Sequence, residues 1–112
     1  MSAIAAPRVI KVLLDAADEV AQIDVRGLGA VGLQLTGTWA GTVTFEATID
    51  GLTWVALNMV PSNSATAAST ATSNGAWTAN VAGFLLMRAR FSTATSGTVQ
   101  AYLQGASFSG RY

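Results

Sequence analysis

Six carboxylates are the side chains of this chain that could transfer protons: Asp15, Asp18, Glu19, Asp24, Glu46 and Asp50. A general acid–base pair needs two carboxyl groups flanking a pocket, with their pKa values shifted apart. Only Asp18 and Glu19 are adjacent, in a segment typical of a turn. Together with Asp15 they could hold a hard cation, but the dense Asp, Asn and Gly spacing of a calcium loop is absent. We interpret these acids as solvated turn residues and predict no metal site.

Nucleophilic catalysis is also disfavoured. Serine and threonine are plentiful, but a hydroxyl nucleophile needs an adjacent base, and the chain has no histidine, no cysteine and a single lysine, Lys11. Gly27, Gly29 and Gly32 match no phosphate-binding fingerprint, because no helical pattern follows them. The sequence therefore predicts a protein that is not an enzyme and needs no cofactor.

Three tryptophans suit binding better than catalysis. Trp39, Trp54 and Trp77 lie in or beside predicted strands. Exposed aromatic rings on a β-sandwich stack against sugar rings, which gives one hypothesis of glycan contact. The alternative is that these rings belong to the core or to an interface.

Two arginines, Arg88 and Arg90, fall on the same face of one predicted strand. There they would pair with Glu46 or Asp50, or contact a neighbouring subunit. Two arginines without a wider basic patch are a poor nucleic-acid footprint, and the formal net charge of the chain is zero. We therefore expect no nucleic-acid partner.

The composition is poor in charge. Charged residues make up 11% of the chain and hydrophobic residues 51%, whereas an average soluble domain has about 25% charged residues. Either Ala, Thr, Ser and Gly replace charge on an ordinary surface, or much of the surface is covered in an assembly. No apolar run approaches the roughly 18–20 residues of a membrane span, and no secretion signal is recognisable. We expect the chain to be made and used without export, with no membrane partner.

The elements that position these residues are predicted to be strands. Residues 30–36 are one predicted strand. Residues 42–49 alternate polar and apolar side chains, with Thr48 on the face opposite Ile49. They stop at Asp50-Gly51 and are expected to pair with residues 53–60 as a hairpin. About eight such segments follow one another, which predicts a single all-β domain over residues 1–112, an antiparallel β-sandwich of jelly-roll type. Residues 1–7 are expected to form an N-terminal arm, 62–75 a polar loop, 93–97 a turn and 107–112 a C-terminal tail.

The alternation also predicts the core. Its inward-facing members are expected to be Leu33, Leu35, Val43, Phe45, Ala47, Ile49, Leu57, Val81, Leu85, Met87, Phe91, Val99, Ala101 and Leu103.

The hairpin GTWAGTVTFEATIDGLTWVAL and the later segment AWTANVAGFLLMRARFSTATSGTVQAYLQGA resemble small β-sandwich proteins encoded among the structural genes of tailed bacteriophages. The shared features are a glycine-tryptophan-glycine entry, an FE-x-S/T-x-DG-x-x-W hairpin, an R-x-R pair and SGTV. In this sequence they are Gly37, Trp39, Gly41, Phe45, Glu46, Asp50, Gly51, Trp54, Arg88, Arg90, Ser96, Gly97, Thr98 and Val99.

This resemblance implies a capsid decoration or cement protein on the exterior of the virion, which bridges subunits of the major capsid protein and associates with itself as a homotrimer. The interface residues expected on this basis are Arg8, Arg88, Arg90, Phe108, Arg111 and Tyr112. The alternative is a module of a tail fibre or baseplate that binds host-surface glycan through Trp39, Trp54 and Trp77.

Overall fold

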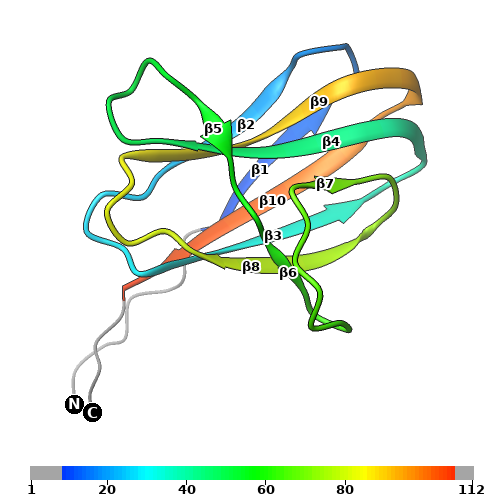
Figure 1. The fold of residues 1–112 in the computed structure, drawn as a ribbon. Coiled ribbons are helices and arrows are strands. Elements are labelled where there is room, and N and C mark those ends of the chain that lie inside the picture. The colour runs from blue at the N-terminus through cyan, green and yellow to red at the C-terminus, as the bar shows by residue number, and fades with distance from the viewer. Residues whose placement is uncertain (1–8, 108–112) are drawn as a thin grey trace, which may run out of the picture.

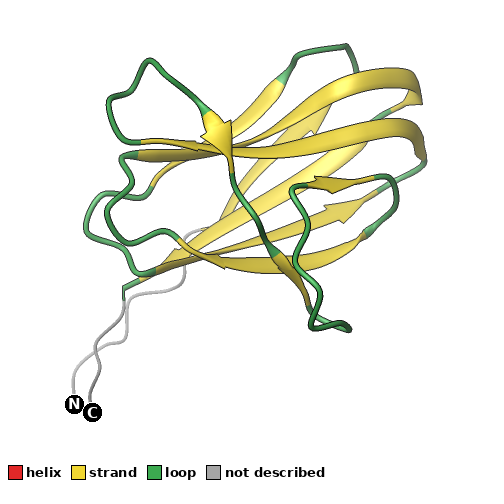
Figure 2. Ribbon diagram, in the orientation of Figure 1, coloured by secondary structure: helices red, strands yellow, loops and turns green. Residues whose placement is uncertain are grey.

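The computed structural model describes residues 9–107, and every regular element in that range is a β-strand (Figures 1 and 2). Three of the strands contain only two residues each. The ten strands are β1 (Val9–Leu14), β2 (Val20–Asp24), β3 (Ala30–Thr36), β4 (Trp39–Thr48), β5 (Val55–Ala56), β6 (Val60–Pro61), β7 (Thr70–Ala71), β8 (Gly75–Asn80), β9 (Leu86–Gly97) and β10 (Val99–Ala106).

The strands form two sheets that pack face to face (Figure 1). Sheet A has the order β1-β10-β3-β8-β6, and sheet B has the order β2-β9-β4-β5, with β7 also pairing with β4. The pairing is nested and antiparallel: β1 pairs with β10, β2 with β9, β3 with β8, and β4 with β5 and β7. Because successive pairs alternate between the two sheets, this is the topology of a jelly roll, and the predicted fold is confirmed.

The core follows from the period of two. In β3, for example, Val31, Leu33 and Leu35 are buried between the sheets, while Gly32 and Gln34 face outward. The predicted core residues that are buried are Leu33, Leu35, Val43, Phe45, Ala47, Leu57, Val81, Met87, Phe91, Val99, Ala101 and Leu103. Leu14, Ile23, Val25, Val31, Met59 and Trp77 are also buried and were not in the predicted set.

Two predicted core residues are not in the core. Ile49 is 70% exposed, because β4 ends at Thr48 and the chain turns there. Thr48, predicted to lie on the face opposite Ile49, is buried instead. Leu85 precedes the first residue of β9, and its side chain lies over Gly51 and is half-buried.

The return strand of the predicted hairpin is much shorter than expected. Val55 and Ala56 pair with β4, and the chain then leaves sheet B. Leu57 and Met59 are buried as the chain crosses to sheet A, where β6 pairs with β8. The predicted strand 53–60 is therefore divided into β5 and β6, because its apolar residues close the side of the sandwich.

Two predicted turns and loops contain strand. The polar segment 62–75 includes β7, which pairs with β4 and buries Ala71. Residues 93–97, predicted to be a turn, continue β9, and register shifts on β4 at Ala40/Gly41 and Thr42/Val43 keep the long pair together. The predicted arm 1–7 and residues 108–112 of the predicted tail lie outside the described residues.

Candidate interaction surfaces

The outer face of sheet B carries an ionic network around Glu46. Arg88 is the register partner of Glu46, and its Nε donates to Glu46 Oε1 at 2.7 Å. Arg90 lies on the same face and donates from Nη2 to Glu46 Oε2 at 3.0 Å. Arg90 Nη1 also donates to Asp18 Oδ1 at 2.8 Å. Of the two acids considered as partners, Glu46 is thus the one that both arginines contact.

Glu46 is held in its charged form. Its side chain is 13% exposed, and burial alone would raise its pKa. The hydrogen bonds from Arg90 and Arg88 outweigh burial, so the pKa of Glu46 lies below its ordinary value. The same contact with Glu46, together with that of Asp18, raises the pKa of Arg90. Glu46 and Arg90 therefore remain ionised at neutral pH, which suits a structural role better than proton transfer.

The structure places the three tryptophans at separate positions. Trp54 lies on the outer face of sheet B, with the Arg88 guanidinium 4.0 Å from the centre of its ring. The Trp39 ring packs edge-on against a buried phenylalanine, and its Nε1 donates to Asn74 Oδ1 at 2.7 Å. Trp77 is 8% exposed and packs on Phe45 in the core. These rings do not form one shared binding platform.

Of the other expected interface residues, Arg8, Phe108, Arg111 and Tyr112 lie outside the described residues, so their role stays a prediction.

The loop that joins β4 to β5 lies where the hairpin turn was predicted (Figure 1), but its exposed apolar side chains were not predicted. We define the apolar loop as residues 49–55. Leu52 is 85% exposed, and the aliphatic side chain of Ile49 also faces solvent. Val55 is exposed to a lesser degree. Ile49 and Val55, with the half-buried Phe84, line a hollow of about 330 Å³. Large exposed apolar patches on a soluble protein mark interaction sites.

Asp50 fixes the conformation of the apolar loop. Its Oδ1 accepts hydrogen bonds from the backbone N–H groups of Thr53 and Leu52, at 2.7 and 2.8 Å, and from Thr48 Oγ1 at 3.0 Å. The Gly51 N–H donates to Thr48 Oγ1. The backbone hydrogen bonds from Thr53 and Leu52 hold the pKa of Asp50 well below its usual range. The apolar side chains are thus presented by a loop that is ordered before any partner binds.

The acids near the β1–β2 turn serve local structure. Glu19 accepts hydrogen bonds from the backbone N–H groups of Asp15 and Ala16, and Asp18 pairs with Arg90. Within residues 9–107, no group of three or more acidic, histidine or cysteine side chains is arranged to hold a metal ion. The same part of the chain has no helix with the length and hydropathy needed to cross a membrane.

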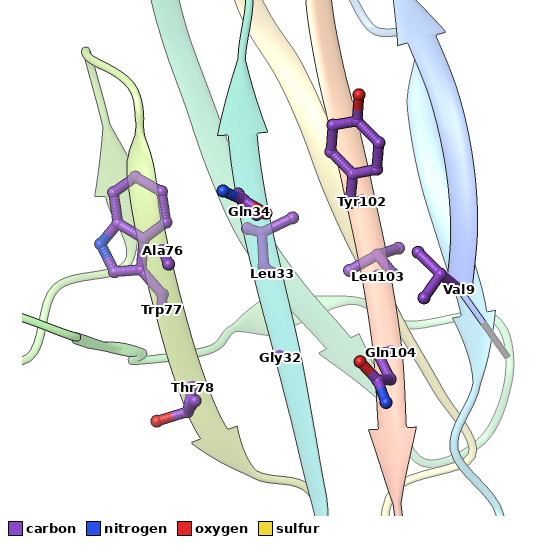
Figure 3. A pocket seen from close by; sticks show the side chains of 10 residues that line it. All are labelled: Val9, Gly32, Leu33, Gln34, Ala76, Trp77, Thr78, Tyr102, Leu103 and Gln104. Carbon is purple, nitrogen blue, oxygen red and sulfur yellow. The ribbon is translucent and has the colours of Figure 1, made fainter. Parts of the chain in front are cut away.

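The outer face of sheet A is hollowed along β3 (Figure 3). Gly32 lies at the centre of a hollow of about 280 Å³, between its register partners Gln104 on β10 and Thr78 on β8. Gln34 and Tyr102 pair in the next row. Two further hollows, of about 190 and 260 Å³, adjoin it along β3. We call this surface the β3 trough.

Neither a protein-family model nor a curated protein sequence matches this chain. Two proteins of low sequence identity are among the solved structures that share its fold. The SPBc2 prophage-derived protein YomS superposes with a TM-score of 0.71 at 14% identity, over 95% of this chain and 100% of YomS. The PBSX exported protein XepA superposes with a TM-score of 0.73 at 19% identity, over 92% of this chain and 39% of XepA. The chain thus spans less than half the length of XepA.

Proposed function

We propose that this chain is a non-enzymatic structural protein of a bacteriophage virion and acts as a capsid decoration protein. It would be made in the host cytoplasm and bind the exterior of the head, where it bridges subunits of the major capsid protein and associates with itself as a trimer. The observation that carries this proposal is the apolar loop, which Asp50 holds in an ordered conformation with Leu52 and Ile49 facing solvent.

The energetics of the apolar loop favour docking. Full burial of a Leu or Ile side chain is worth about 1.5–3 kcal/mol, so covering Leu52 and Ile49 supplies a useful part of a binding free energy. The loop is already ordered by Asp50, so association loses little conformational entropy there. Binding to the assembled head would then stabilise the head by mass action.

Two further points support a phage protein. The sequence resembles phage structural proteins in its hairpin and R-x-R strand, and one protein of the same fold is described as prophage-derived. The alternative, a tail-fibre or baseplate module that binds glycan through its tryptophans, has less support, because the three rings lie at separate positions and Trp77 is in the core.

The test is binding to heads assembled from the major capsid protein of the same phage. We expect the protein to co-sediment with these heads and to raise their Tm. Leu52→Asp should abolish both effects and leave the isolated domain folded, because the side chain is exposed. Leu13→Asp is the matched control, because Leu13 is an exposed leucine on β1 of the other sheet. The Leu13→Asp protein should bind heads as the unmodified protein does. No binding by the unmodified protein, or normal binding by Leu52→Asp, would overturn the proposal.

A further inference from the structure

The β3 trough exists because small residues line its floor. Ala30 and Gly32 face outward from β3, while β10 contributes Gln104 to one wall and β8 contributes Thr78 to the other. The 280 Å³ and 190 Å³ hollows share Gly32 and Gln104, and the 190 Å³ and 260 Å³ hollows share Ala30. The three hollows therefore form one surface that runs along β3. A surface of this shape suits an extended ligand.

The polar groups of the β3 trough are available to a ligand. Within residues 9–107, the side chains of Gln34, Gln104 and Thr78 make no hydrogen bond with the protein, and Figure 3 shows them around Gly32. Gln100 on the same face is engaged, because its Oε1 accepts from Thr36 Oγ1 at 3.0 Å and from a tyrosine hydroxyl at 3.1 Å. Among the described glutamines on this face of sheet A, Gln34 and Gln104 are thus the ones whose amides are free, and both line the hollow.

The described residues of the β3 trough are uncharged, which favours a neutral ligand. None of the described residues that line its three hollows is charged. Among residues 9–107, Lys11 is the nearby cation, and its Nζ lies over the Tyr102 ring at 5.5 Å from the centroid. Phosphate groups and nucleic acids are recognised through arginine and lysine clusters, and the described residues of this surface form no such cluster.

We propose that the β3 trough binds a neutral saccharide chain. A glutamine amide has two N–H donors and a carbonyl acceptor. It can therefore hydrogen-bond to neighbouring hydroxyl groups of a sugar, which both donate and accept. The Tyr102 ring and the aliphatic side chains of Val9 and Val60 offer apolar walls for the C–H faces of a pyranose ring. An added peptide strand is a poorer occupant, because it pairs with the free backbone of a sheet edge, whereas this is a sheet face.

This site is separate from the surface used by the proposed decoration function. The β3 trough belongs to sheet A, whereas the apolar loop follows β4 of sheet B. Of the tryptophans considered for glycan contact, Trp77 borders the hollow but is only 8% exposed, while Trp39 and Trp54 lie on the side of sheet B. A protein attached to a head through the apolar loop would therefore be free to hold a saccharide.

Gly32 offers a sharp test. A Cβ added there would meet no atom closer than the Gln104 carbonyl oxygen at 3.9 Å, and its φ is not positive, so a larger side chain fits the backbone and fills the hollow. Gly32→Val should therefore fold and block the site. Gln104→Ala and Gln34→Ala remove the amides without adding bulk, and Gln22→Ala on sheet B is the matched control.

The measurement is an amide chemical-shift titration of the full chain with cellotetraose, maltotetraose and chitotetraose, and with a heparin tetrasaccharide as the charged comparison. We expect at least one neutral probe to shift the amides of β3, β8 and β10. Gly32→Val and Gln104→Ala should weaken its binding by at least about tenfold, while Gln22→Ala and Leu52→Asp bind as the unmodified chain does.

Three results would overturn the proposal: no shift with any neutral probe up to about 20 mM, binding that survives both Gly32→Val and Gln104→Ala, or tighter binding of the heparin fragment. Because Leu52→Asp tests the head contact and leaves the trough intact, failure of one proposal is distinguishable from failure of the other.

Discussion

The guanidinium of Arg88 lies 4.0 Å from the centre of the Trp54 ring. Arg88 belongs to β9 and Trp54 to the apolar loop, so this contact ties the loop to sheet B. The same guanidinium donates to Glu46, which fixes its position over the ring. The exposed loop is therefore anchored at both ends, by Asp50 near its start and by Trp54 near its end.

A double-mutant cycle measures the Arg88–Trp54 contact. We expect Arg88→Met and Trp54→Leu to couple by about 0.5–2 kcal/mol in the free energy of unfolding, because a cation over an indole ring is attracted by the ring quadrupole. Urea unfolding of the two single variants and the double variant gives this energy. Arg26→Met is the control partner, since Arg26 pairs with Asp24, and its coupling to Trp54 should be near zero. Equal coupling energies in the two cycles would show that the contact between Arg88 and Trp54 is not the source of the coupling.

Glu46→Gln should destabilise the fold by about 2–3 kcal/mol. The substitution leaves two partly buried guanidiniums, of Arg88 and Arg90, side by side without their shared carboxylate. This is less than the loss for a fully buried pair, because both arginines retain some exposure to water. Asp24→Asn breaks an exposed pair and should have little effect. Urea unfolding that ranked the two variants in the opposite order would refute the prediction.

The pH dependence of stability should be flat near neutrality and steep in acid. The chain has no histidine, so no side chain with an ordinary pKa titrates between pH 5 and 8. The folded-state pKa of Glu46 is lowered, so its contribution is complete above the unfolded value near 4.5 and is lost as the pH falls through the lower folded value. The lowered pKa of Asp50 acts in the same direction.

Thermal unfolding between pH 2 and 8 checks this prediction. Tm should hold constant above about pH 5 and then fall, and Glu46→Gln should make the fall shallower. A Tm that rises on acidification, or a step between pH 6 and 7, would show that other groups control stability.

Gly41→Ala should prevent folding or cost more than about 3 kcal/mol. Gly41 has φ of +140° at a register shift of β4, and a Cβ there would collide with the backbone oxygen of Thr93 on β9. Gly27→Ala is the matched control, because Gly27 also has a positive φ, +76°, but open space around it. Its cost should be about 1 kcal/mol, from backbone strain alone. Soluble expression and urea unfolding compare the two, and similar losses would point to strain rather than collision.

The long strands could be predicted because each carries an unbroken period of two. Ala30–Thr36 is predicted and observed with the same bounds, and its buried side chains are those on the expected face. The alternation fails where a local hydrogen bond competes with it. Thr48 and Ile49 exchange their expected environments because Thr48 Oγ1 donates to Asp50 and closes the turn. A period of two contains no information about such a bond.

The interaction surfaces were harder to predict, because they depend on neighbours that are distant in sequence. Glu46 and Arg88 were considered as a pair, since both face outward from predicted strands, and the register of β4 with β9 brings them together. The β3 trough had a weaker signal, a glycine at an outward position of a strand. Gly32 becomes the centre of a hollow only when Gln104 and Thr78 are placed on either side of it.

The nested order of the strands has a consequence for synthesis. β10, the last of the described strands, lies between β1 and β3, so β1 has no neighbour in its sheet until nearly the whole described chain has left the ribosome. Such long-range closure is slow compared with helical folding, and it exposes unpaired strand edges in the meantime. Residues 99–106 therefore act as the closing element of folding, and a chain truncated before them would retain β1 as an open edge available to other chains.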